Sequence, residues 1–161
     1  MEIPAEIFDS ASIMESKGKI KQLDPVLINK IAAGEVIDGP YSIVKELLEN
    51  SIDSGADLIK IYTLGGGMDS IIIEDNGTGI SYQDLPLSIA RHATSKIENL
   101  DDIESITSFG FRGEALASIA SIAHMEIKSR TKDENGGFLE CRGGKILRRE
   151  KTACNPGTVI K

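Results

Sequence analysis

The chain has 161 residues, of which 40% are hydrophobic and 27% charged, and this composition suits a soluble domain with a core of its own. Its formal net charge of −7 argues against a dedicated binder of nucleic-acid phosphates, because such domains usually carry a basic face. The apolar runs are too short to cross a bilayer, and the start of the chain is not of the export type, so we expect no secretion.

The first third of the chain predicts two helices. Residues 1–18 show no sustained hydrophobic period, so we expect a loosely ordered extension there and the folded domain over residues 19–161. Apolar residues at helical spacing predict a first helix over residues 23–33. A second helix is predicted after Gly39–Pro40, where residues 43–52 form one apolar stripe.

The middle of the chain predicts a hairpin followed by helices. Residues 58–64 and 69–75 are rich in β-branched side chains, and the three glycines between them predict a hairpin turn. Ser81 and Asp84 resemble a capping box for a helix through Leu87–Arg91. Further helices are predicted near Ile103 and over residues 114–123.

The last third predicts strands. Residues 124–131 and 137–143 flank Asn135–Gly136, which is a strong signal for a hairpin turn. Two more strands are expected over residues 145–151 and from residue 157 onward. Helices early in the chain and antiparallel strands late predict an α+β sandwich, in which helices cover one face of a sheet.

The second helix carries the first candidate site. Glu46 and Asn50 are four residues apart and share the face opposite the apolar stripe. A carboxylate there could orient or deprotonate a water, and the amide oxygen could bind a hard cation such as magnesium. The alternative is an exposed polar face with a Lys45–Glu49 ion pair, which is the commoner outcome for such patterns.

The segment EDNGTGI, residues 74–80, is a second candidate. Asp75 ends an apolar strand, so its carboxylate would lie at the mouth of the core and could accept a hydrogen bond from an exocyclic amine such as that of adenine. Gly77 and Gly79 would let a ligand approach the backbone closely. The alternative is a simple Asp–Asn–Gly turn.

Two later loops contain candidate phosphate-binding residues. Gly110 and Gly113 flank Phe111–Arg112 just before a helix start, an arrangement that favours an anion site. The string GxxxxGK[ST] does not occur, which excludes a P-loop. The second loop contains Thr94, Ser95 and Lys96, which are polar or cationic. These residues could bind phosphate, or they could equally belong to a plain solvated loop.

Histidines and cysteines do not predict a metal site. His92 and His124 are too far apart and too poorly accompanied for zinc, and we interpret both as structural. Cys141 and Cys154 are too few for a disulfide framework, so reduced thiols in a cytosolic or nuclear compartment are expected. The sequence shows no Ser-His-Asp or Cys-His arrangement.

Four strings, in chain order, resemble the nucleotide-binding domain of MutL-type mismatch repair proteins: KELLENSIDSGA, DNGTGI, ARHATSKI and GFRGEALASI. INKIAAGEVIDGP resembles the segment that precedes them, so the resemblance covers about residues 23–160. FRGEAL separates this family from its relatives, which are gyrase B subunits, heat-shock chaperones and sensor histidine kinases, together called the GHKL ATPases. The resemblance implies their α+β (Bergerat) fold, a two-layer sandwich with a mixed, mostly antiparallel sheet covered by helices on one face.

The resemblance also implies a slow, magnesium-dependent ATPase. Glu46 resembles the general base, Asn50 the magnesium ligand, Asp75 the acceptor of the adenine amine, and Gly79 a residue that gives the ring space. Thr94 to Lys96 would begin an ATP lid whose closure brings two N-terminal domains together. The full set of implied nucleotide contacts is Asn50, Asp53, Asp75, Gly79, Thr94, Ser95, Lys96, Gly110, Arg112, Gly113 and Thr158.

The implied partners are a MutS-type mismatch recognition protein and a second copy or a paralogue, with DNA bound only through regions absent here and no membrane. The location would be cytoplasmic in a bacterium and nuclear in a eukaryote. The chain departs from the family at Ser54 and Gly39, where alanine and arginine are usual, and neither is expected to touch the chemistry. Because it ends at Lys161, before the family's second α/β domain, we expect a fragment with weak or no ATPase activity.

Two alternatives to a MutL-type ATPase remain at this point. The chain could be a module that binds a nucleotide without useful turnover, since by resemblance a lysine of the second domain contacts the terminal phosphate. It could also belong to another GHKL branch, of the chaperone or topoisomerase type. FRGEAL weighs against this second alternative.

Overall fold

A computed structural model describes residues 23–24, 27–28, 31, 37–90 and 114–161. The predictions for residues 1–18 and for a helix near Ile103 lie outside these residues. Leu27, Ile28 and Ile31 are helical, in agreement with the predicted first helix.

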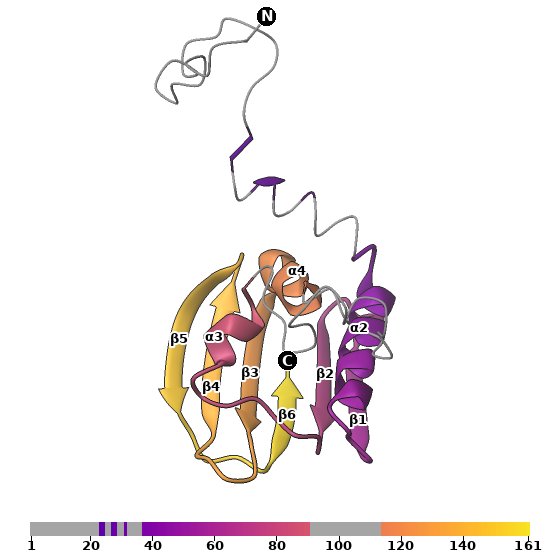
Figure 1. Cartoon of the computed structure of the whole chain (residues 1–161). Helices are drawn as coiled ribbons and strands as arrows, with labels where there is room; N and C mark the ends of the chain where they lie inside the picture. The colour runs from indigo at the N-terminus through magenta and orange to yellow at the C-terminus, as the bar shows by residue number, and fades with distance from the viewer. Residues whose placement is uncertain (1–22, 25–26, 29–30, 32–36, 91–113) are drawn as a thin grey trace, which may run out of the picture.

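One sheet dominates the fold (Figure 1). Its six strands lie in the order β1-β2-β6-β3-β4-β5. All pairs between these described strands are antiparallel, so the sheet is antiparallel rather than mixed, within the α+β class that was predicted. The strands are β1 (Ile59–Leu64), β2 (Ser70–Asp75), β3 (His124–Arg130), β4 (Gly137–Arg142), β5 (Lys145–Lys151) and β6 (Gly157–Ile160).

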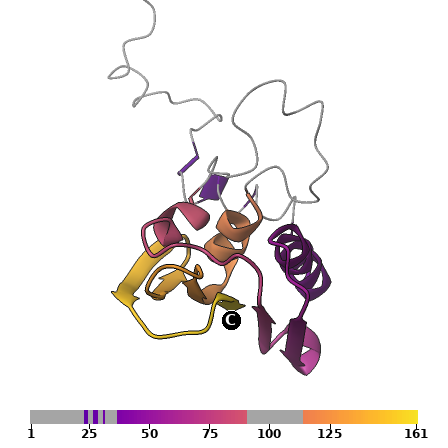
Figure 2. The ribbon, with the colours of Figure 1, turned by 60° about the horizontal axis from the view of Figure 1, so that its bottom comes forward.

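The helices of the described residues lie on one face of this sheet (Figure 2). They are α2 (Pro40–Asp53), α3 (Leu85–Ser88) and α4 (Ala115–Ile122), while the turn between β1 and β2 forms a 3-10 helix, η2 (Gly65–Gly67). Helix α2 contacts β2 and α4, and α4 contacts β3 and β4. None of the helices in the described part of the chain is long and apolar enough to cross a membrane.

Strand register explains where the core lies. Ile73, Ile160, Ile127 and Leu139 face one another across four adjacent strands, and all are at most 8% exposed. Each such side chain contributes ~1.5–3 kcal/mol when it leaves water. Leu47, Ile119 and Ala120 cover this row from α2 and α4. Because side chains alternate along a strand, residues two positions away lie on the same covered face.

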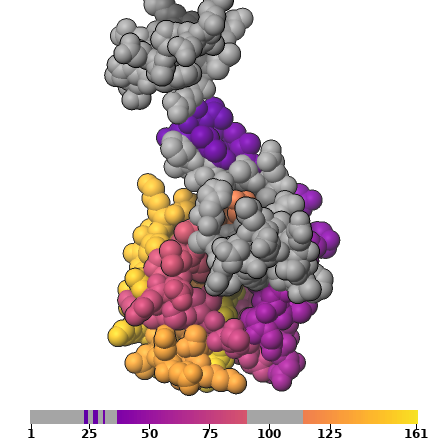
Figure 3. All heavy atoms as spheres, in the orientation of Figure 1, coloured from indigo at the N-terminus to yellow at the C-terminus, as the bar shows by residue number. Residues whose placement is uncertain are grey.

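The loop between β2 and α3 packs against the far edge strand. Arg149 of β5 donates a hydrogen bond of 2.7 Å to the Tyr82 carbonyl, and its guanidinium lies 4.1 Å from the centre of the Tyr82 ring. The space-filling view shows α3 and this loop beside β5 (Figure 3). The loop therefore spans the covered face from β2 to β5.

Two predicted boundaries were wrong. The helix expected through Leu87–Arg91 is α3, which ends at Ser88; Arg91 lies outside the described residues. Ser81 and Asp84 do interact, since the Asp84 N–H donates to Ser81 Oγ at 3.1 Å and the Ser81 hydroxyl donates to the Asp84 carboxylate at 2.8 Å. They do not form the predicted capping box, because the carboxylate binds the Ser81 hydroxyl instead of its backbone N–H, and the capping residue of α3 is Asp84, which makes no side-chain cap bond. Helix α3 begins at Leu85, earlier than the apolar pattern suggested.

The hairpin between β3 and β4 is confirmed, but its turn lies at residues 132–133 and not at Asn135–Gly136. The Gly136 carbonyl already accepts a hydrogen bond of 2.9 Å from the N–H of Thr152, the residue that follows β5. A Cβ at Gly136 would lie 2.5 Å from Cys154 Sγ, so close packing requires this glycine.

Candidate functional site

Asp75 ends β2 and is held by three hydrogen-bond donors. The backbone N–H groups of Gly77 and Thr158 donate to Oδ1 at 3.0 and 3.2 Å, and the Ser51 hydroxyl donates to Oδ2 at 2.9 Å. An ionised carboxylate offers about four lone-pair positions, so roughly one remains, on Oδ2. The carboxylate is therefore fixed in orientation and can still accept one hydrogen bond from a ligand.

A cavity of about 90 Å³ opens beside this carboxylate, between α2, α4 and the centre of the sheet. Four residues that the sequence pointed to line it together: Asn50, Asp75, Gly79 and Thr158. The rest of the wall is mostly apolar and consists of Leu47, Ser51, Ser54, Ile73, Ile80, Leu116 and Ile160. Such a cavity suits a flat apolar group with a hydrogen-bond donor at its edge.

Strand register explains why the cavity has one polar wall. Asp75 and Thr158 are register partners, and Thr158 is also the partner of Ser129. These three residues lie two positions along from the apolar row of Ile73, Ile160 and Ile127, on the same covered face. The core therefore changes from apolar to polar within one side-chain repeat, at the cavity.

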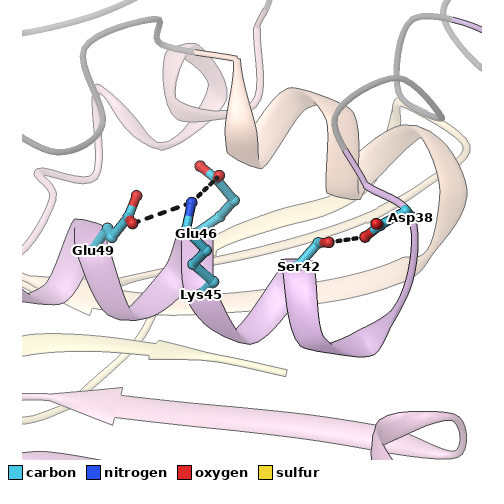
Figure 4. Close-up of polar contacts among 5 residues, drawn as sticks. All are labelled: Asp38, Ser42, Lys45, Glu46 and Glu49. Carbon is cyan, nitrogen blue, oxygen red and sulfur yellow. Dashed lines mark hydrogen bonds and ion pairs between the residues drawn. The ribbon is translucent and has the colours of Figure 1, made fainter.

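Glu46 lies one helical turn before Asn50 on α2 and does not line this cavity. Its Oε1 is 3.8 Å from Lys45 Nζ, which is also 3.3 Å from Glu49 Oε1 (Figure 4). The ion pair of the alternative interpretation is thus present. Glu49 raises the pKa of Lys45, first by its hydrogen bond and then by its charge, with a smaller effect from Glu46.

The start of α2 is stabilised without a side-chain bond from its capping residue, Gly39. Instead, the Ser42 hydroxyl donates a hydrogen bond to the Asp38 carboxylate, four residues earlier (Figure 4). Pro40 occupies the first turn, where its missing N–H leaves no helix bond unmade. Asp53, at the other end of α2, is partly buried and does not line the cavity.

Gly79 is required by the protein's own packing. Its φ is +74°, and a Cβ there would lie 2.0 Å from the Arg130 carbonyl oxygen at the end of β3. The space that its missing side chain frees is filled by this backbone, whereas we expected it to accommodate a bound ring. Gly79 still lines the cavity through its main chain.

Three serines that the sequence did not predict as contacts belong to the site. Ser51 binds Asp75, and Ser129 is the register partner of Thr158. Ser54, which we expected to stay clear of the chemistry, lines the cavity. Its spacing of four residues from Asn50 could have indicated this, whereas a serine at a buried position of an alternating strand, such as Ser129, carries no comparable signal.

The remaining predicted nucleotide contacts lie outside the described residues. They are Thr94, Ser95, Lys96, Gly110, Arg112 and Gly113.

Comparisons with known proteins show a family likeness over most of the chain. The family of histidine kinase-, DNA gyrase B-, and HSP90-like ATPases matches residues 40–155. DNA mismatch repair protein MutL of Chlamydia pneumoniae is 53% identical over 147 residues, and MutL of Pseudomonas fluorescens is 49% identical over 150 residues. These matches cover 91% and 92% of this chain but 25% and 24% of the relatives, so the chain spans about a quarter of their length.

Solved structures show the same likeness. The N-terminal domain of a DNA repair protein matches with a TM-score of 0.66 and 34% identity, over 83% of this chain and 38% of that one. The Aquifex aeolicus MutL ATPase domain complexed with ADP matches with a TM-score of 0.54 and 29% identity, over 78% of this chain and 42% of that one.

Proposed function

Since the chain belongs to the histidine kinase-, DNA gyrase B- and HSP90-like ATPases, as a MutL-type member, we propose that it binds ATP and hydrolyses it slowly. The observation that carries this proposal is Asp75, which is fixed by three donors and keeps one lone pair at the mouth of a mostly apolar cavity. Adenine combines a flat ring with an exocyclic amine and fits that combination.

The size of the cavity indicates that it holds only one part of the nucleotide. Its volume of about 90 Å³ is well below the ~300–1,000 Å³ typical of sites that enclose a whole ligand. We assign it to the base alone. The phosphates then extend past Asn50, along the face of α2 that carries Glu46.

Asn50 is the described residue best suited to hold magnesium, which the family resemblance implies. Its amide oxygen is a hard ligand at the edge of the cavity, and magnesium usually takes one or two protein ligands together with phosphates and waters. The described residues contain no cluster of three or more histidine, cysteine or acidic side chains that could hold a metal ion. A bound magnesium ion would neutralise phosphate charge.

Glu46 would act as the general base in hydrolysis. It lies one turn from Asn50, so its carboxylate can accept a proton from a water near the terminal phosphate. Asp53, one turn beyond Asn50, would border the phosphate side of the site. The roles expected of the loops at residues 94–96 and 110–113 are a lid and a phosphate cradle.

The whole protein would use ATP binding and hydrolysis as a conformational switch in mismatch repair. ATP would close the lid and bring two N-terminal domains together, and a MutS-type protein would be a partner. DNA would be bound by other regions, because this chain carries a net charge of −7.

A second candidate is a nucleotide-binding module without useful turnover. The 3.8 Å contact between Lys45 and Glu46 favours it, because the lysine competes for the carboxylate that must accept the proton. Single-turnover hydrolysis of ATP, compared with Glu46→Ala, separates the two. We expect a slow rate that Glu46→Ala abolishes; identical rates would exclude the ATPase for this chain and leave the binding module.

A further inference from the structure

Ser129 joins the segments that build one wall of the cavity. It lies on β3 and is 0% exposed. The Ile80 N–H donates to its hydroxyl at 2.7 Å, the hydroxyl donates to the Gly157 carbonyl at 2.9 Å, and Thr158 Oγ1 lies 2.9 Å away. Ile80 and Thr158 line the cavity, whereas Ser129 does not.

The number of protons fixes the direction of these bonds. A serine hydroxyl has one proton to donate and two lone pairs. The Gly157 carbonyl takes the proton, because it can only accept, and the Ile80 N–H occupies one lone pair, because it can only donate. Thr158 satisfies the second lone pair by donating its only proton, so its oxygen can offer only lone pairs to the cavity.

Ser129 also anchors the loop that follows β2. Gly79 packs against the carbonyl of Arg130, and the next residue, Ile80, binds the side chain of Ser129. Two consecutive loop residues are therefore held by two consecutive residues of β3. A change at Ser129 would affect both the loop and the polarity of Thr158.

We propose that Ser129 is a positioning residue that makes the cavity select an amine-bearing base over a carbonyl-bearing one. This inference rests on the proposed binding of adenine nucleotides. With the Thr158 proton committed to Ser129, the side-chain oxygens of Asp75 and Thr158 both face the cavity as acceptors. An amine can donate to such a wall, whereas a ring carbonyl meets lone pairs opposite its own.

Calorimetric titration of the full chain with ADP and with inosine diphosphate tests the proposal. Inosine diphosphate carries a carbonyl in place of the two-proton amine and a single N–H at the neighbouring ring nitrogen. Ser129→Ala leaves the Thr158 proton free to donate into the cavity and leaves the Ile80 N–H without its acceptor. We expect ADP affinity to fall about tenfold or more while inosine diphosphate loses less, so that the preference narrows. Ser129→Thr keeps the hydroxyl, so this variant should retain the preference of the unsubstituted chain for ADP over inosine diphosphate.

Two controls distinguish this role from a general loss of structure. Ser121 is also buried, but its hydroxyl donates only within α4, to the Ser118 carbonyl, so Ser121→Ala should change neither affinity. In a Thr158→Val background the hydroxyl that Ser129 orients is gone. Ser129→Ala should then lower the affinity for both nucleotides equally, without a further change in preference.

Equal losses for the two nucleotides in Ser129→Ala alone, or unchanged affinities, would overturn the proposal. If Ser129→Ala does not fold, Ser129→Cys replaces it, because a thiol occupies the position and forms only weak hydrogen bonds. A result in which the unsubstituted chain binds neither nucleotide would instead remove the proposed function, and this inference with it.

Discussion

The Ser51 hydroxyl on α2 donates a hydrogen bond of 2.9 Å to Asp75 Oδ2 at the end of β2. Ser51 is 3% exposed and directly follows Asn50, so the bond connects the helix that carries the proposed magnesium ligand to the strand that carries the proposed base acceptor. The phosphate side and the base side of the site are thereby held in one fixed relationship.

Ser51→Ala should weaken both the fold and nucleotide binding. It removes a buried donor from a carboxylate, and we expect the free energy of unfolding to fall by about 1–3 kcal/mol. Urea unfolding and calorimetry with ADP measure the two effects. Ser54→Ala is the matched control, because Ser54 lines the same cavity but its hydroxyl donates only to the nearby Ser51 carbonyl. Equal effects of the two substitutions would contradict the role of the Ser51 bond.

Asp75→Asn should weaken the binding of adenine nucleotides. The amide keeps one acceptor oxygen but places an NH2 group where a second acceptor stood, so an amine on the ligand meets a donor. The loss is typically ~1–3 kcal/mol, to be measured by calorimetry with ADP. Asp133→Asn, in the exposed turn between β3 and β4, should have no effect. Unchanged affinity in Asp75→Asn would mean that the base lies elsewhere.

Asn50→Ala should remove the magnesium dependence of ATP binding. Without the amide oxygen the ion loses its proposed protein ligand, so affinities measured with magnesium and with a chelator should converge. Glu49→Gln serves as control, since Glu49 lies on the same helix and pairs with Lys45. If the unsubstituted chain already binds ATP equally well with and without magnesium, Asn50 does not have this role.

Local elements of this fold could be predicted because each depends on a short stretch of chain. The stripe over residues 43–52 became α2, and the β1–β2 hairpin formed at the three glycines. The order of strands could not be predicted in the same way. Strand β6 pairs with β2 across 83 residues, between Asp75 and Thr158, and it also separates β2 from β3. No local pattern specifies such a pairing.

Site residues could be predicted from the sequence where a polar side chain interrupts or borders a local run of apolar residues. Asn50 and Asp75 stood out as polar groups beside apolar runs, and both line the cavity. Ser129 could not be recognised in this way, because a small side chain at a buried position of an alternating strand looks like an ordinary core residue. Its importance comes from partners that are 28 to 49 residues away in sequence, and only the folded structure brings them together.

Gly79→Ala should destabilise the protein far more than an ordinary substitution at a positive φ. Gly66 provides the comparison, because its φ of +64° is similar and a Cβ there would meet nothing within 4 Å. Gly66→Ala should cost only the ~1–2 kcal/mol of a left-handed alanine. At Gly79 the Cβ would also clash with the Arg130 carbonyl, so the loop must move and ADP binding should fall. Similar unfolding free energies for both variants would show that this contact relaxes easily.

Stability should decrease at alkaline pH because of Cys141. Burial of this thiol, followed by the charge of Glu140, raises its pKa from 9.0 to about 11. The unfolded chain therefore loses the thiol proton at a lower pH than the folded chain does, so the stabilisation is complete below pH 9 and is lost progressively between pH 9 and about 11. Urea unfolding across this range should show a slope that Cys141→Ala flattens. An equal slope in both proteins would assign the alkaline loss to other groups.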